Sequence, residues 1–288
     1  MITTPIDSMI PDIRALWKQC FGDNDAFLDA FFAHRYRADD MLVCVEDDEE
    51  LVAMLCLFPL TLHTPAGAMR ARYIYAVATA EAWRGLGISH TLMQAALARM
   101  HEDGEDVAIL VPASDSLFGF YQKQGFAPLF SLQRWETNPC DFPRPKGTAQ
   151  PCSLEAHFRL RNAAFATAGA FAAWDTQALA YIHLGVLQEG GQVLHLQQGD
   201  KEGCAVVVPR QGSAHVKELV LCGLSPFDAM ALVHSVIMAQ HYVVSLPAGT
   251  LPSLTDQPFA MVQSVSPRAD DLLLQAQSDT AYFALVMD

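Results

Sequence analysis

The feature that most constrains the fold of this chain is residues 76–89, which read AVATAEAWRGLGIS. This stretch begins as an apolar, strand-like run, passes through an irregular segment, and reaches Arg84, Gly85 and Gly87 where an apolar helix begins. Glycine destabilises helices, so two glycines at a helix start indicate that the backbone itself is needed there. The stretch therefore predicts a strand, a loop and a helix in direct succession.

The flanking sequence predicts a mixed sheet with helices on its faces. Apolar residues at helical spacing predict helices at residues 7–20, 25–36, 88–102 and 116–123. β-branched and apolar runs predict strands at residues 41–46, 51–63, 70–79, 107–112 and 126–136. The order is two helices, two strands, a strand-loop-helix unit and a final β-α-β unit, which predicts an α/β fold.

The second half of the chain repeats this order of elements. Residues 138–151 hold four prolines and are predicted to be a linker between a domain at residues 1–137 and a domain at residues 152–288. Helices are expected at residues 154–166, 174–184 and 225–241, and strands at 192–198, 203–209, 215–222 and 243–246. No arginine-glycine loop precedes the helix at 225–241, so we expect a duplicated fold whose second copy has lost the loop.

Composition limits the classes of partner. The 288 residues carry 18 basic and 32 acidic side chains, a net charge of −14, which argues against nucleic acid or an anionic membrane as partner. The charge favours cationic ligands such as amines, or simply keeps a soluble protein dispersed. Seven cysteines without metal-ligand spacing predict reduced thiols and no metal site. With no signal peptide and no long apolar run, a cytoplasmic location is expected.

The loop has the chemistry of an anion site. A helix start leaves backbone amides unpaired and carries a partial positive charge, which favours anions. Gly85 and Gly87 would let a pyrophosphate approach those amides, and Arg84 adds a positive charge. The loop lacks the Lys-Ser/Thr end of a P-loop and the third glycine of a dinucleotide fingerprint. These residues alone are equally consistent with a purely structural turn from strand to helix that needs glycine and carries an exposed arginine.

The loop also resembles the acetyl-coenzyme A loop of the GNAT superfamily of N-acetyltransferases, Arg/Gln-x-x-Gly-x-Gly/Ala after the fourth strand. Arg84, Gly87 and Ser89 occupy the patterned positions, with Ser89 in place of the usual glycine or alanine. Residues 117–126, LFGFYQKQGF, are similar to the family's Phe-Tyr-x-x-x-Gly-Phe signature. The second half resembles the degenerate second copy of tandem GNAT proteins, including the enhanced-intracellular-survival acetyltransferases, so the resemblance implies a duplicated acyl-CoA N-acyltransferase fold.

This resemblance implies acetyl-CoA as co-substrate and no metal. The pantetheine arm would follow the backbone of Val77, Ala78 and Thr79. The pyrophosphate site would consist of Arg84, Gly85, Leu86, Gly87, Ile88, Ser89 and His90. Tyr121 holds the position of the general acid that protonates the departing thiolate; the alternative is that its ring only packs against the sheet.

The general base is not identified from the sequence. The strand at residues 70–79 contains no carboxylate. Glu81 is expected to be a solvated loop residue, and His34, Glu218 and Asp288 are distant candidates. Deprotonation of the amine by water, in place of a protein side chain, is an alternative that the sequence leaves open.

The implied activity is acetyl transfer to a primary amine of a small molecule or a peptide, by direct attack on the thioester. Aromatic residues are candidates for the substrate pocket wall, namely Phe27, Phe31, Phe32, Tyr73 and Tyr75. The alternative is a catalytically inactive coenzyme A-binding module with a regulatory or assembly role. The sequence leaves open whether the chain forms a homo-oligomer and whether the second domain contributes to the active site.

Overall fold

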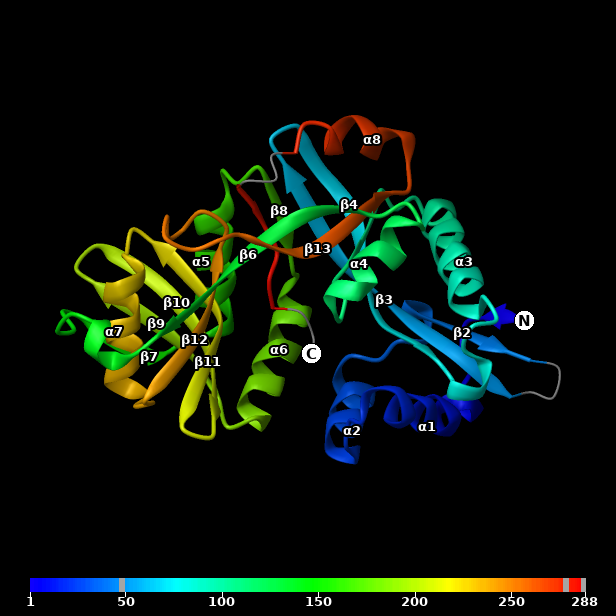
Figure 1. Cartoon of the computed structure of the whole chain (residues 1–288), viewed down its shortest axis with the longest axis horizontal. Helices are drawn as coiled ribbons and strands as arrows, with labels where there is room; N and C mark the ends of the chain where they lie inside the picture. Colours follow the sequence, from blue (N-terminus) through cyan, green and yellow to red (C-terminus); the bar gives the residue numbers. More distant parts are fainter. Residues whose placement is uncertain (47–49, 277–279, 286–288) are drawn as a thin grey trace. The chain divides into compact units, whose positions relative to one another are not determined.

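The computed structural model describes residues 1–46, 50–276 and 280–285. The chain forms two compact units, each built from segments that are not contiguous in sequence (Figure 1). Unit 1 comprises Met1–Leu62, Gly67–Ala127 and Ala260–Leu274, and unit 2 comprises His63–Ala66, Pro128–Phe259 and Gln275–Asp288. Among the described residues, no helix is long and apolar enough to cross a membrane.

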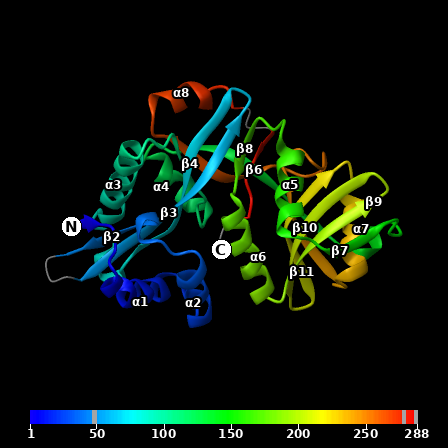
Figure 2. The same ribbon diagram turned by 180° about the vertical axis from the view of Figure 1, so that it is seen from behind.

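Unit 1 is a mixed sheet with helices on both faces. Its strands are β1 (Ile2–Thr3), β2 (Met41–Val45), β3 (Leu51–Thr64), β4 (Gly67–Thr79), β5 (Val107–Leu110) and β13 (Gln257–Ser264), hydrogen-bonded in that order. Its helices are α1 (Ile10–Phe21), α2 (Asp25–His34), α3 (Ile88–Glu102), α4 (Asp115–Gln122) and α8 (Pro267–Leu273), with 3-10 turns η1 (Asp7–Met9), η2 (Ala38–Asp40) and η3 (Glu81–Trp83). Helices α1 and α2 lie on one face and α3 on the other (Figures 1 and 2).

Local sequence signals explain these elements. Helix α1 carries Pro11 in its first turn and ends at Gly22, which has a left-handed φ of 75°. Asn24 caps α2 by accepting a hydrogen bond from the Phe27 amide. Strand β5 is apolar and fully buried, as expected for a strand covered on both faces. The sheet core contacts one apolar face of α3, formed by Leu92, Met93, Ala96 and Met100.

The edge of β5 is occupied by a strand from the far end of the chain. Strand β13 pairs antiparallel with β5, from Met261 opposite Leu110 to Ser264 opposite Val107. The sequence predicted that the strand at residues 126–136 ends the first domain. That strand is β6 (Ala127–Thr137), and from Pro128 onward it belongs to unit 2.

The returning segment is held in unit 1 by hydrogen bonds as well as by β13. The Ser266 hydroxyl donates to Asp106 Oδ1 at 2.8 Å, and the Val265 amide donates to the Asp106 carbonyl at 2.8 Å. Arg268 Nη2 donates to the Ala68 carbonyl at 2.9 Å. Unit 1 therefore needs residues 260–274 to complete its sheet.

Unit 2 has the same layout. Its main strands run in the order β6, β12 (His241–Pro247), β11 (Ser213–Cys222), β10 (Lys201–Arg210), β9 (Gln192–Gln198) and β7 (Thr148–Pro151), and β8 (Ala170–Ala173) pairs with β14 (Ala281–Tyr282). Helices α5 (Leu154–Phe165) and α6 (Thr176–Gln188) lie on one face of the sheet and α7 (Pro226–Val236) on the other (Figures 1 and 2).

The segment 138–151, expected as a linker, is part of unit 2. It contains a 3-10 turn at Pro139–Asp141 and the strand β7, which lies at the edge of the sheet and pairs with β9. An edge strand tolerates proline, because one side of its backbone needs no partner. The prolines therefore exclude a central strand but not this edge strand.

The two units share one further detail. In each, a pair of parallel strands stays in register for four residues and then parts, at Ile74–Leu110 in β4–β5 and at Val216–Val244 in β11–β12. Each first strand has a backbone irregularity just beyond that point. Ala76 in β4 has φ of 51°, and in β11 Lys217 is the extra residue of a bulge opposite Val206 and Val207. The chain is a duplicated α/β fold.

Candidate functional site

The candidate site begins where β4 leaves β5. Strand β5 ends at Leu110, whereas β4 continues to Thr79. Between these points Ala76 takes a left-handed conformation, which costs a non-glycine residue about 1–2 kcal/mol. On the other edge, the Ala80 amide still donates to the Val52 carbonyl of β3 at 2.8 Å. Residues 77–79 are thus supported by β3 and have no partner on β5, which leaves one strand edge available for a ligand.

The predicted pantetheine residues form this edge. Ala78 is buried, while Val77 and Thr79 are half-buried. The Thr79 carbonyl accepts hydrogen bonds from the Arg84 Nε at 3.1 Å and from the Cys20 thiol at 3.6 Å. The end of β4 is therefore fixed from both the loop and α1.

The loop after β4 consists of η3 and residues 84–87, and α3 begins at Ile88. Gly85 has φ of 80° and Gly87 has φ of 82°, conformations that side-chain-bearing residues adopt only with strain. A Cβ added at either position would have no heavy atom within 4 Å. The glycines are needed for the backbone conformation, and the space beside them is open.

The backbone amides at the start of α3 adjoin these glycines in the chain. The Thr91 amide is the first to bond back, to the Gly87 carbonyl at 3.0 Å. Across the part of the chain that the structure describes, the amides of residues 85–90 have no acceptor. The helix has 15 residues, so its N-terminus carries the partial positive charge of a full helix. Free amides at such a terminus form an anion site.

Arg84 binds the strand end. Its Nη2 lies 3.8 Å from the Cys20 Sγ, and its Nε donates to Thr79 as described above. The guanidinium thereby ties the loop to the end of β4. The sequence predicted a charge for the anion and gave no sign of this contact.

Tyr121 lies on α4 with its ring buried. The ring meets Phe120 and Phe126 edge-on, with centroid distances of 5.1 and 5.9 Å. It belongs to the same apolar cluster as Ile74 and Leu110, the residues at which β4 and β5 part. Its hydroxyl forms no hydrogen bond with another described residue. Burial raises the pKa of the Tyr121 phenol, so it stays protonated at neutral pH and can donate a hydrogen bond.

Comparison with known proteins agrees with this geometry. Residues 2–129 match the family model described as an acetyltransferase (GNAT) domain. The chain carries a GNAT domain. The match assigns acyl transfer as the chemistry of that domain. No curated protein matches the chain in sequence.

Solved structures show the fold of the whole chain. A protein from Enterococcus faecalis V583, described as a probable N-acyltransferase, is 18% identical with a TM-score of 0.75, covering 93% of this chain and 73% of its own. A GCN5-related N-acetyltransferase from Anabaena variabilis is 16% identical with a TM-score of 0.72, covering 92% and 73%. Eis1 from Mycobacterium abscessus is 13% identical with a TM-score of 0.67, covering 92% and 74%. The likeness thus extends through both units.

The structure of the GNAT domain explains why the FYQKQGF segment has a glycine at residue 125. Gly125 has φ of 99°, and a Cβ there would lie 2.9 Å from Nε2 of Gln263 on β13. The positive φ is what favours glycine here, because the end of the flexible Gln263 side chain could shift away from a Cβ.

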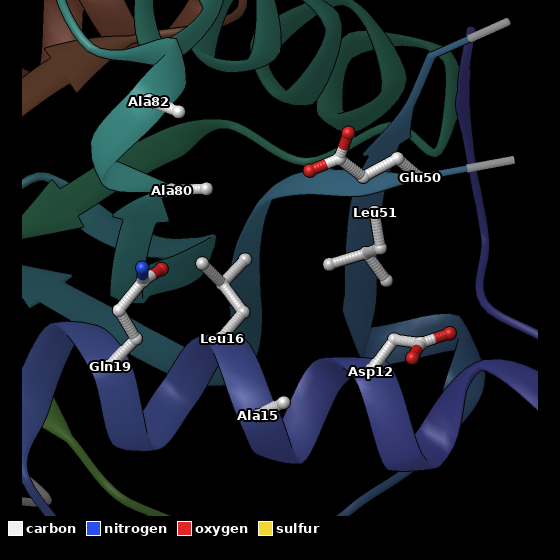
Figure 3. A pocket seen from close by; sticks show the side chains of 8 residues that line it. All are labelled: Asp12, Ala15, Leu16, Gln19, Glu50, Leu51, Ala80 and Ala82. Carbon is white, nitrogen blue, oxygen red and sulfur yellow. The ribbon is translucent and has the colours of Figure 1, made fainter. Parts of the chain in front are cut away.

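The GNAT domain has a cavity of about 440 Å³ beside α1, which we call the α1 pocket. Its lining residues are Asp12, Ala15, Leu16, Gln19, Glu50, Leu51, Ala80 and Ala82 (Figure 3). Asp12 and Gln19 come from one face of α1, Ala80 links β4 to η3, and Ala82 lies in η3. Figure 3 shows Leu16 and Leu51 pointing toward one another across the pocket. With Asp12 and Glu50 on its rim, the pocket suits a cationic group.

Two of the five predicted wall residues belong to the core, and Phe27, Phe32 and Tyr75 are half-buried. Phe31 and Tyr73 are buried, and Tyr73 stacks on Tyr75 with centroids 5.9 Å apart. Trp17, which is not among the predicted wall residues, belongs to the same aromatic group, with its ring centroid 4.7 Å from that of Phe31 and 5.9 Å from that of Tyr75. Helical spacing placed Trp17 on a buried face but gave no sign of its partners.

None of the candidate bases gains support. Glu218 is fully buried in unit 2, and the neighbouring Arg161 and His157 hold the pKa of its carboxylate at about 2 against the cost of burial. His34 and Glu81 are exposed. Asp288 lies outside the described residues. Within residues 1–46, 50–276 and 280–285, no group of three or more His, Cys, Asp or Glu could hold a metal ion.

Proposed function

We propose that the chain is an acetyl-CoA-dependent N-acetyltransferase that acetylates a primary amine of a small molecule or peptide by direct attack. One observation carries the proposal: β4 leaves β5 directly before a loop whose amides have no acceptor among the described residues. A strand edge without a partner suits the amides of a pantetheine arm. Free amides at the start of a helix suit a pyrophosphate.

The residues that would hold the coenzyme follow from this arrangement. Val77, Ala78 and Thr79 would offer backbone donors and acceptors to the pantetheine arm. The amides of residues 85–90 would hold the pyrophosphate, with Arg84 fixing the loop on β4. When bound, acetyl-CoA supplies an acetyl thioester, a carbonyl that a neutral amine can attack.

The acceptor amine must lose a proton before it attacks. An alkyl amine with a pKa near 10 is neutral in only roughly one molecule in a thousand at pH 7. The carboxylates of Asp12 and Glu50 in the α1 pocket would attract the protonated form toward the domain. We assign no residue as the base, and water can carry the proton away.

Tyr121 would donate its hydroxyl proton toward the departing thiolate. The hydroxyl lacks a competing partner within the described chain, and its raised pKa keeps the proton in place until charge develops on sulfur. Because a phenol of raised pKa is a weaker acid than a thiol, we expect stabilisation by a hydrogen bond to matter more than full proton transfer.

The test is release of free thiol from acetyl-CoA in the presence of polyamines, aminoglycosides, amino acids and peptides. Turnover with any amine, with product mass increased by one acetyl group, supports the proposal. Tight acetyl-CoA binding without turnover across the panel supports instead the inactive coenzyme A-binding module.

A further inference from the structure

The α1 pocket in unit 1 has an apolar floor and an acidic rim at one end. Leu16 and Leu51 form the floor, and both are buried. Figure 3 shows Asp12 and Glu50 at one end of the pocket and Gln19 at the other. A ligand there meets negative charge at one end and hydrocarbon along its length.

The two carboxylates of the rim are not neutralised within the described chain. Asp12 lies on α1, and Glu50 directly precedes β3. The Asp12 side chain forms no hydrogen bond or ion pair with any described residue. Glu50 Oε1 accepts a hydrogen bond from Trp83 Nε1 at 3.4 Å, and this donor is neutral. Two carboxylates without a cationic partner beside one cavity attract a positively charged ligand.

The cations of α1 face away from the pocket. Asp12 and Gln19 are two helical turns apart and share the pocket face, whereas Arg14 and Lys18 lie on the opposite face of the helix. There they pair with carboxylates of α2, with Arg14 Nη2 at 2.7 Å from its partner. Arg84 donates to the end of β4 and does not line the pocket. The lining therefore contains no lysine or arginine.

The space between the rim and Gln19 is apolar. Side chains of Ala15, Ala80 and Ala82 line it together with the two leucines of the floor. The volume of about 440 Å³ lies within the range of small-molecule pockets. A bare metal ion would leave this hydrocarbon surface unused, whereas an ammonium ion on an aliphatic chain uses both the charge and the surface.

We propose that the α1 pocket binds one end of a linear aliphatic polyamine. Its ammonium group lies between Asp12 and Glu50, and its methylene chain runs over Leu16 and Leu51 toward Gln19. Ala80 follows the last residue of β4, so the chain leaves the pocket beside the strand that offers its edge to the pantetheine arm. The binding itself needs no coenzyme.

This site also names the class of acceptor, a step that rests on the proposed function. About 13 Å of extended chain separates Ala76, where β4 has left β5, from Ala80 at the pocket. An amine with one end held in the pocket needs a long chain to bring its other end to the thioester. That free amine, once deprotonated, attacks the thioester carbonyl: the C–N bond forms, the C–S bond breaks, and the thiol leaves with a proton.

Calorimetric titration of the full chain with spermidine, without acetyl-CoA, tests the binding. The hexaamminecobalt(III) ion carries the same charge without a hydrocarbon chain, and tetraethylene glycol is a neutral linear chain. We expect spermidine to bind at least about 10-fold more tightly than either, because only spermidine has both features. Glu50→Gln should weaken spermidine binding about 3- to 5-fold, the effect of losing an exposed ion pair.

A second variant fills the pocket without touching its carboxylates. Ala15 is exposed on α1, where lysine is as compatible with a helix as most residues, so Ala15→Lys should fold, which circular dichroism checks. Its ammonium group would occupy the pocket and should abolish detectable spermidine binding. Spermidine affinity of the folded Ala15→Lys variant equal to that of the wild type would place the ligand elsewhere and overturn the proposal.

Glu102→Gln is the matched control, since Glu102 is an exposed carboxylate on α3, across the sheet from α1, and the same charge is lost. It should leave spermidine affinity unchanged. The proposal is wrong if spermidine does not bind the folded wild-type chain, if hexaamminecobalt(III) binds as tightly, or if Glu102→Gln weakens binding as much as Glu50→Gln. Spermidine binding without turnover of any amine supports this site and contradicts the proposed enzyme, whereas turnover of other amines without spermidine binding does the reverse.

Discussion

The two units have the same arrangement of strands and helices, but they differ at the start of the helix that follows the parted strands, α3 in unit 1 and α7 in unit 2. In unit 1, α3 follows Gly85 and Gly87 with amides that have no acceptor in the described chain. In unit 2, α7 starts at Pro226 behind the capping hydroxyl of Ser225. The shared fold supplies parted parallel strands in both units, whereas the few residues before the helix differ, and under our proposal these residues determine which unit binds a pyrophosphate.

The point where the strands part also differs. Ala76 places only a methyl group beside the proposed path of the thioester in unit 1, whereas Lys217 places a charged side chain at the equivalent point in unit 2. The two halves of the duplicated sheet therefore differ at the point where their strands part. The predictions below test each side of this contrast, from the largest expected effect to the smallest.

Glu218→Gln should destabilise unit 2 most. Its carboxylate accepts Arg161 Nε at 2.9 and 3.1 Å and His157 Nε2 at 2.9 Å, all fully buried or nearly so. Removing the charge leaves the Arg161 guanidinium uncompensated, a loss of about 3–5 kcal/mol in the free energy of unfolding. Urea unfolding followed by circular dichroism measures this loss. Glu202→Gln, which breaks a partly exposed pair, should cost only about 0–1 kcal/mol.

Gly87→Glu should abolish detectable acetyl-CoA binding to unit 1, a loss of at least about 100-fold. The new carboxylate would project into the space before α3 and repel the pyrophosphate. Gly199→Glu is the control, because Gly199 also has a positive φ of 64° and open space around it. The two variants should lose similar stability, about 1–2 kcal/mol, while Gly199→Glu retains wild-type affinity. Equal affinity in both variants would remove the loop from the coenzyme site.

Tyr121→Phe should lower kcat by about 100-fold and leave acetyl-CoA affinity nearly unchanged, because the hydroxyl acts on the departing sulfur. Steady-state thiol release gives both quantities. Tyr36→Phe is the matched control: it removes a tyrosine hydroxyl that is buried away from the site and has no partner in the described chain, and kcat should stay within about twofold. If Tyr121→Phe keeps wild-type kcat, its ring only packs.

Mild acid should weaken unit 2. Burial and the neighbouring His157 lower the pKa of His183 to about 4 from its ordinary 6.5. Between these two values the unfolded chain binds more protons than the folded one, so stability falls as pH falls from about 6.5 to 4. Because His183 is half-buried, we expect only about 1–2 kcal/mol. Thermal unfolding at pH 7 and pH 4.5 measures it, and His183→Gln should reduce the difference.

Local signals made much of unit 1 predictable. The predicted helix at residues 88–102 is α3 itself, because glycines precede it and its apolar face repeats regularly. Strands β2 to β5 were found within a few residues, since β-branched runs mark them directly. The loop geometry also followed from the positions of Gly85 and Gly87.

The sequence contains no comparable local signal for contacts between distant segments of the chain. Nothing in residues 257–264 indicates that they pair with β5, because a strand edge is chosen by the whole sheet rather than by neighbouring residues. The contact of Arg84 with Thr79 and Cys20, and the buried group around Glu218, likewise join residues far apart in the chain.

Calorimetric titration of the full wild-type chain with acetyl-CoA tests the central claim most directly. If only unit 1 has the helix start that a pyrophosphate needs, binding should saturate at one coenzyme per chain, and Gly87→Glu should remove it. Two coenzymes per chain, or a single one that survives Gly87→Glu, would contradict the account.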